Sequence, residues 1–242
     1  MNRMLVLGAN GALGRHIVQQ AISSGFAVSV LVRREANERA FDTRSVTIHR
    51  GDLAKMSTEA LANLFREYQV VVNTAGYVGE GQQFVDLVDR IVGGLEEIGG
   101  ASRPVSWFLA GLGLLDVDEG GRRGVDLPQI KETYWPHVAN YNRIRRTDLD
   151  WRILCPGPMV DEEMNGDVGV IHTIDRVPMD LPRHMAKLSD LEALRALAPL
   201  VSRSVIPYQA AASVILSNCT PGGEMSRHRV GVALAVEGRR DE

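Results

Sequence analysis

The sequence predicts an α/β fold, a Rossmann-type doubly wound parallel sheet with a small C-terminal substrate cap. Three observations indicate it: apolar runs alternate with amphipathic segments over 5–155, a glycine-rich turn joins the first run to the first helix, and an irregular segment follows residue 157. Alternation at this spacing is typical of parallel strands connected by crossover helices. We therefore expect a single domain over residues 1–242, in which residues 157–204 form the cap.

The first four predicted strands are short apolar runs at 5–7, 28–32, 46–48 and 70–72. A helix is predicted between the first two, with apolar residues at helical spacing: Leu13, Ile17, Ala21 and Ile22. Gly25 follows this helix and suits its C-terminal cap. Ser57 is placed to cap a second helix that buries Leu61, Leu64 and Phe65.

The alternation continues through the middle of the chain. A long amphipathic helix is predicted over 84–98, followed by a strand at 105–109 and a glycine-rich, acidic loop at 111–124. Pro136 is expected to open the next helix at its first position, because that position needs no N–H donor. The sixth strand is predicted at 151–155.

The segment after the sixth strand is less regular, and residues 161–183 show little periodicity. Ser189 and Glu192 have the spacing of a capping box, and the helix they start should end before Pro199. Pro207 is expected to open a last helix, and residues 229–236 alternate like a late strand. Ligands of such sheets bind beyond the carboxyl ends of the strands, so residues 157–204 are placed to cover a substrate.

Composition and charge exclude several classes of protein. The chain has 242 residues, of which 45% are hydrophobic and 24% charged, and this balance is typical of a globular protein. Its net charge is −3, whereas nucleic-acid-binding proteins usually carry an excess of basic residues. No apolar run approaches the ~20 residues that cross a bilayer, and the start reaches Gly8 too soon for a signal peptide. With two cysteines, we expect a cytoplasmic protein that contacts a small-molecule substrate but neither nucleic acid nor membrane; pairing into a homodimer stays open.

The most specific chemical signal is the turn after the first strand, which reads Gly8, Ala9, Asn10, Gly11, Ala12, Leu13 and Gly14. Gly8 lets the chain leave the strand tightly, Gly11 clears space for a pyrophosphate, and Gly14 allows close packing of the helix. The free N–H groups at the start of that helix would face the phosphates. With a strand before it and a helix after it, the pattern predicts a dinucleotide site rather than a Walker loop.

Two arginines follow the second strand and bear on the choice of cofactor. Arg33 or Arg34 could pair with a 2′-phosphate and stack on adenine, which favours NADP(H). NAD stays possible, because Glu35 could instead take the ribose hydroxyl while both arginines are simply solvated.

The glycine turn, Arg33 and the segments 51–53, 73–76 and 151–157 together resemble an atypical short-chain dehydrogenase/reductase. The subgroup they resemble is the NAD(P)H-binding, NmrA-like and flavin-reductase-like set, which is loosely called epimerase-like. The resemblance implies cofactor contacts by the following residues: Asp52 and Leu53 at the adenine, Thr74, Ala75 and Gly76 at the ribose and pyrophosphate, and Pro156 and Gly157 near the nicotinamide. Asp52 could equally be a turn residue, and 73–76 could be strand-end packing.

The sequence departs from that family at the catalytic positions. Catalytic members carry a serine at the end of the fifth strand and a tyrosine with a lysine four residues later, whereas here residues 107–111 contain no serine. Tyr141 and Arg145 have the right spacing but the wrong cation, since arginine does not relay protons at neutral pH. Tyr134 and His137 are the candidates for a rebuilt site, and the alternative is a tyrosine packed in a loop beside a solvated histidine.

These observations predict an NAD(P)H-dependent oxidoreductase that passes a hydride to a small carbonyl, quinone or flavin-like acceptor. Catalysis by orientation alone would tolerate the missing serine and lysine. Two alternatives stay open: a non-catalytic NAD(P)-sensing regulator of the NmrA-like kind, and an epimerase or dehydratase of the sugar-nucleotide type.

Overall fold

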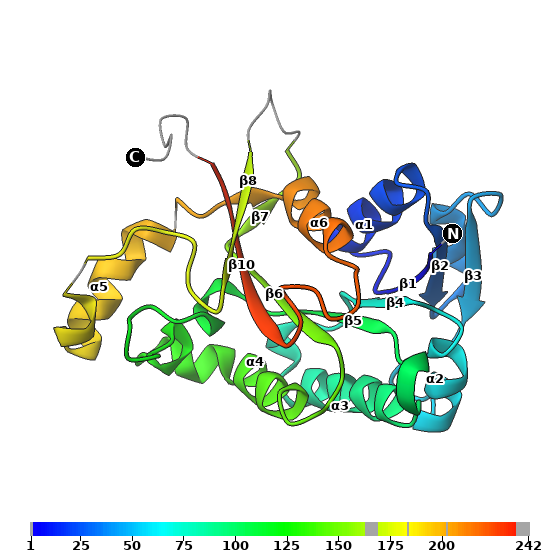
Figure 1. Cartoon of the computed structure of the whole chain (residues 1–242), viewed down its shortest axis with the longest axis horizontal. Helices are drawn as coiled ribbons and strands as arrows, with labels where there is room; N and C mark the ends of the chain where they lie inside the picture. The colour runs from blue at the N-terminus through cyan, green and yellow to red at the C-terminus, as the bar shows by residue number, and fades with distance from the viewer. Residues whose placement is uncertain (1, 163–168, 183, 202, 236–242) are drawn as a thin grey trace.

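An eight-stranded sheet forms the centre of the protein (Figure 1). The computed structural model describes residues 2–162, 169–182, 184–201 and 203–235. In spatial order the strands are β3 (Val46–Arg50), β2 (Ala27–Val32), β1 (Arg3–Leu7), β4 (Val70–Asn73), β5 (Val105–Leu109), β6 (Trp151–Pro156), β10 (His228–Leu234) and β8 (Val170–Ile174). Neighbouring strands are parallel from β3 to β10, and β8 is antiparallel to β10. The predicted doubly wound fold is confirmed.

Helices cover both faces of this sheet in two layers (Figure 1). One layer is α1 (Ala12–Ser23) with α6 (Tyr208–Ser217), and the other is α2 (Thr58–Phe65), α3 (Gln82–Glu96) and α4 (Ile130–Ile144). Strand β1 shows why both layers are needed, because its side chains alternate between the two cores. Met4 and Val6 enter the core beneath α1, while Leu5 and Leu7 enter the core beneath α3.

The chain reverses its direction of winding between β1 and β4. The strands run β1, β2, β3 toward one edge, and the chain then returns to place β4 on the other side of β1. Loops on the two sides of β1 diverge at their carboxyl ends and leave a crevice, which is where ligands of doubly wound sheets bind.

Predicted local signals end α1 and begin α2. Gly25 has a φ of 81°, its N–H bonds the carbonyl of Ile22, and the N–H of Phe26 bonds the carbonyl of Ala21. These two bonds define a Schellman motif, which favours glycine at this position. The side chain of Ser57 accepts a hydrogen bond of 3.1 Å from the N–H of Ala60, so the predicted cap of α2 is confirmed.

Two proline predictions were wrong. Helix α4 begins at Ile130, six residues before Pro136, and α5 (Asp190–Val201) continues past Pro199. A proline inside a helix leaves one carbonyl of the preceding turn without its donor. The residues preceding each proline by four, Glu132 and Arg195, are exposed, so water can take the place of that donor.

The predicted cap region divides between the sheet and a separate cover. Strand β8 lies inside it and joins the edge of the central sheet, which the weak periodicity of 161–183 did not reveal. The other described elements of the region are β7 (Met159–Val160), a 3-10 helix over Met185–Lys187 and α5; β7 pairs with β9 (Ile206–Pro207), which follows the predicted cap. Residues 163–168, 183 and 202 of the predicted cap, and Val236 of the predicted late strand, lie outside the described residues. Within the described part, no helix has the length and apolar character that crossing a bilayer requires.

Candidate active site

The glycine turn between β1 and α1 brings three backbone segments into contact. Gly8 has a φ of 77°, and a Cβ atom there would lie 2.5 Å from the N–H nitrogen of Ala75 after β4. A Cβ on Gly14 would lie 2.4 Å from the carbonyl oxygen of Gly8. A side chain at either position would separate α1 from the strand ends, so the first and third glycines are required by packing.

The start of α1 presents free backbone donors. The first helical hydrogen bond runs from the N–H of Arg15 to the carbonyl of Gly11 at 3.0 Å, so the N–H groups of Ala12, Leu13 and Gly14 have no acceptor within the helix. The first turn of α1 contains no acidic residue. Free donors and the positive end of the helix dipole are therefore available to an anion at this position.

A pocket of about 440 Å³ lies in front of this turn. It collects most of the residues predicted to bind the cofactor: Gly8, Asn10, Gly11, Arg33, Asp52, Leu53, Thr74, Ala75 and Gly76. Arg34, Ala12, Leu13 and Gly14 do not line it. Glu80 and Gln83 do, although no sequence motif marks them; Glu80 ends a 3-10 helix over Val78–Glu80, and Gln83 lies in the first turn of α3.

Two of these predicted residues are also used structurally. The hydroxyl of Thr74 donates to the carbonyl of Leu7 at 2.9 Å, which joins the ends of β1 and β4. Asp52 accepts from the N–H of Ala54 at 3.2 Å and lies 3.9 Å from the Lys55 ammonium. Asp52 is therefore a turn aspartate that also faces the pocket, so the two readings of the sequence are compatible.

The three charged residues after β2 are arranged differently from one another. Arg33 is exposed, lines the pocket and has no ion-pair partner among the described residues. Arg34 occupies the position before a short 3-10 helix over Glu35–Ala40 and does not line the pocket. Glu35 does not line it either. Of these three side chains, Arg33 alone lines the pocket.

A second, larger pocket lies at the ends of β5 and β6. Its volume is about 580 Å³, its lining is mostly apolar, and it contains four predicted site residues: Tyr134, His137, Pro156 and Gly157. A smaller pocket of about 170 Å³ joins the two, sharing Thr74, Ala75 and Gly76 with the first and Ala110 and His137 with the second. The three pockets form one track across the carboxyl ends of the strands.

His137 stands where the connecting pocket meets the apolar pocket. Its ring stacks on Tyr134, with centroids 6.0 Å apart, and meets the edge of Phe84 at 5.9 Å. Burial lowers the pKa of the imidazole to about 4, because the charged form would lose its hydration. His137 lies in the middle of α4 and is neutral at pH 7, so the alternative reading as a solvated first-turn histidine is wrong.

Tyr134 shares that helix, so the alternative reading of this residue as part of a loop is also wrong. Its side chain is 39% exposed, and it forms part of the wall of the apolar pocket. Pro156 and Gly157, at the end of β6, also line this pocket. A Cβ on Gly157 would lie 2.2 Å from the carbonyl oxygen of Ser204, so this glycine also lets the chain beyond α5 approach β6.

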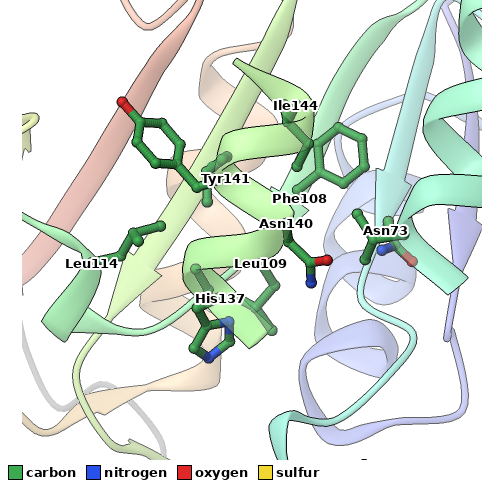
Figure 2. A pocket seen from close by; sticks show the side chains of 11 residues that line it. Asn73, Phe108, Leu109, Leu114, His137, Asn140, Tyr141 and Ile144 are labelled. Atoms are coloured by element: carbon green, nitrogen blue, oxygen red, sulfur yellow. The ribbon is translucent and has the colours of Figure 1, made fainter. Parts of the chain in front are cut away.

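The tyrosine with catalytic spacing lies elsewhere. Tyr141 points away from Asn73 and His137 (Figure 2), and its ring lies 5.5 Å from the Arg145 guanidinium and 5.1 Å from that of Arg229. The pair Tyr141 and Arg145 thus forms a cation–π contact, and neither residue lines any of the three pockets of the track. Cys155 is fully buried in the core, and burial raises the pKa of its thiol.

Comparison with known proteins decides the family. The family model described as NAD(P)H-binding matches residues 8–184, which is most of the chain. The chain belongs to the NAD(P)H-binding family. This match agrees with the resemblance seen in the glycine turn and in the strand-end segments.

The individual proteins that this chain resembles share low sequence identity with it. An isoflavone reductase homologue of Nicotiana glauca is 28% identical over 110 residues, which are 42% of this chain and 33% of the relative, so the match spans about a third of that protein. A candidate NADH-flavin reductase from Streptococcus pneumoniae superposes with a TM-score of 0.69 at 17% identity, covering 97% of this chain and 100% of that one. An anaerobillin reductase from Escherichia coli O157:H7 superposes with a TM-score of 0.61 at 14% identity, covering 99% of both chains.

The residues of this NAD(P)H-binding protein fit a nicotinamide dinucleotide. The α1 N-terminus has free donors that would suit a diphosphate, the pocket at Arg33 and Leu53 has room that an adenosine would need, and the connecting pocket leads to His137. Among the described residues, no group of histidine, cysteine or carboxylate side chains could hold a metal ion. Asn140, on α4 below His137, is a buried polar residue of this site that the sequence analysis did not single out.

Proposed function

We propose that this protein is an NAD(P)H-dependent oxidoreductase that reduces a flat, conjugated acceptor such as a quinone or a flavin. The observation that carries the proposal is the apolar pocket that continues the cofactor track at the ends of β5 and β6. An acceptor of this class is itself mostly apolar, so its burial against the lining favours binding by about 25 cal/mol per Å². The reductase names of two structural relatives agree with this class of reaction.

The chain's contribution to this reaction is positioning. When bound, the cofactor supplies a hydride to the acceptor and is oxidised, and a proton from solvent completes reduction of a quinone to a hydroquinone. Tyr134 and His137 on one side, with Pro156 and Gly157 on the other, hold the acceptor at the end of the track. The apolar lining keeps water from the reacting faces, and orientation of this kind needs no dedicated proton donor.

We further propose that NADP(H) is the preferred cofactor. Arg33 is the cation that lines the adenosine pocket, and Glu35, the acid that would favour NAD, does not line it. A guanidinium can bond a 2′-phosphate through two N–H groups and stack on the adenine.

The test is consumption of NADPH with a panel of quinones, flavins and aldehydes. We expect turnover with quinones or flavins and little with small aliphatic aldehydes. Absence of turnover across the panel, with NADPH binding intact, would contradict the proposal. That result would instead favour a nucleotide-sensing regulator. The missing serine and the contact of Tyr141 with Arg145 agree with this alternative as well.

Two leucines of α5 offer a matched pair of variants. Leu197 lines the apolar pocket, whereas Leu191 is exposed and lines none of the three pockets of the track. Leu197→Gln should raise the KM for the acceptor about tenfold, because a buried leucine contributes about 1.5–3 kcal/mol, and should leave the Kd of NADPH unchanged. Leu191→Gln should change neither. Equal effects of both variants would exclude this pocket as the acceptor site.

A further inference from the structure

A small cavity lies beside His137, lined by residues of α3 and α4 and of the strands β4, β5 and β6. Its volume is about 10 Å³, and Figure 2 shows the side chains around it. Three buried polar atoms beside it have no hydrogen-bond partner: both amide atoms of Asn140 and Nδ1 of His137. Asn140 is 6% exposed, so bulk water does not satisfy its amide.

Leaving these atoms unpartnered would be costly. A buried donor or acceptor without a partner costs about 1–3 kcal/mol, and nearly all such groups in proteins bond to protein or to an ordered water. Asn73 also lines the cavity, but its side-chain oxygen already accepts from the N–H of Ala75 at 3.1 Å. A cavity of about this volume has room for one water molecule.

We propose that this cavity holds one ordered water, which Asn140 binds and which donates a hydrogen bond to Nδ1 of His137. The imidazole is then fixed in the tautomer that carries its proton on Nε2. Asn140 thereby acts as a positioning residue, because it determines which nitrogen of His137 donates into the acceptor pocket.

We take Nδ2 of Asn140, and not its equally unpartnered Oδ1, as the group that binds the water, and the tautomer of His137 distinguishes the two arrangements. The Nδ2 group of Asn140 can only donate, so it binds the oxygen of the water and leaves both water hydrogens free to donate. Nδ1 of His137 is an unpartnered atom that can accept one of them. The other ring nitrogen, Nε2, lies 3.8 Å from the Cβ position of Gly111, which lines the apolar pocket. Nδ1 thus faces the cavity while Nε2 faces the acceptor.

The consequence for the reaction rests on the proposed function. An oxygen of the acceptor becomes negative as the hydride arrives, and an N–H group already aimed at it stabilises that charge. The imidazole is neutral because burial lowers its pKa. Its Nε2–H group can donate a hydrogen bond to that oxygen without transferring the proton. The proton that completes the reduction still comes from solvent.

The tautomer can be measured without any cofactor or substrate. Nitrogen-15 NMR of the protein, with the His137 signals assigned by loss in His137→Asn, should show a proton on Nε2 and an accepting Nδ1. Asn140→Leu should abolish the preference, and Asn142→Leu, two residues along the same helix and remote from the pockets, should retain it. A proton on Nδ1, or an even mixture, in the unmodified protein would overturn the proposal.

Turnover provides a second, separate measurement. Asn140→Leu should lower kcat about tenfold or more without changing the KM of the acceptor, since it removes an interaction made in the transition state. Asn140→Ser keeps a hydroxyl and space for water, so its kcat should lie between those of Asn140→Leu and the unmodified protein. The same variant tests the proposal if Asn140→Leu does not fold. An unchanged kcat in both variants would overturn the role in positioning. Absence of turnover in the unmodified protein would instead contradict the proposed function and leave the tautomer measurement valid.

Discussion

A single exposed side chain, Arg33, should determine which form of the cofactor binds. Arg33→Ser removes the charged donors that a 2′-phosphate would meet, and a charge-assisted hydrogen bond contributes about 1.5–3 kcal/mol. We expect the Kd of NADPH to rise about tenfold while that of NADH stays constant, as measured by calorimetry. Arg34→Ser is the matched control, because Arg34 does not line the pocket, and it should change neither Kd. Equal loss for both nucleotides in Arg33→Ser would contradict this role.

The buried imidazole of His137 should make stability depend on pH. Its pKa is about 4 in the folded protein and near 6.5 when unfolded, so the unfolded chain binds an extra proton between these values. The free energy of unfolding should therefore be highest above pH 6.5 and fall as the pH decreases toward 4, by at most about 3 kcal/mol from this group. Denaturant titrations of His137→Gln should lack this part of the slope, whereas those of His172→Gln should retain it, since His172 is exposed.

Residue-scale chemistry was only partly accessible from the sequence. Arg33, Tyr134 and His137 were predicted because their residue types suit the chemistry and they follow recognisable elements. Asn140 was not predicted, because its importance depends on a cavity that α3 and α4 line together with three strands. The placement of Pro136 at the start of the helix also concealed that His137 is buried in the middle of it.

At the scale of elements, the turn from β1 to α1 can be tested with two glycines that share a backbone conformation. Gly8 and Gly25 have φ values of 77° and 81°, but a Cβ on Gly8 would meet the backbone after β4, whereas a Cβ on Gly25 meets open space. Gly25→Ala should cost about 1–2 kcal/mol from the left-handed conformation alone. Gly8→Ala should cost more and should abolish NADPH binding, because α1 must move away from β4. Urea unfolding and calorimetry measure both effects, and equal costs would contradict the packing argument.

The predictability of the elements follows from how deeply they are buried. Strands β1, β2 and β4 are buried on both faces, so each appears in the sequence as an apolar run that glycine or polar residues end. Strand β8 lies at the edge of the sheet with Ile171 and His172 exposed, so its sequence lacks such a run. Capping residues located the start of α2 and the end of α1, whereas prolines misplaced the start of α4 and the end of α5.

At the scale of the whole molecule, one sheet connects the beginning and the end of the described chain. Strand β10 pairs with β6 on one side and with β8 on the other, and α6 packs against α1. His16 of α1 also bonds Asp161, beyond β6, at 2.9 Å. The described segment after β6 is therefore tied to the sheet at several places, and the single domain over 1–242 stays a prediction.

Cofactor binding should accordingly stabilise the chain as one unit. NADPH at about 100 times its Kd stabilises the folded state by ~2.7 kcal/mol, which for a chain of this size corresponds to a rise of about 5–10 °C in Tm. Differential scanning calorimetry should show a single transition that moves as a whole, because the cradle at Gly8 and the apolar pocket at Leu197 belong to one sheet and its cover. A transition that divides, with one part insensitive to NADPH, would mean that the cover over β6 unfolds independently of the cofactor-binding strands.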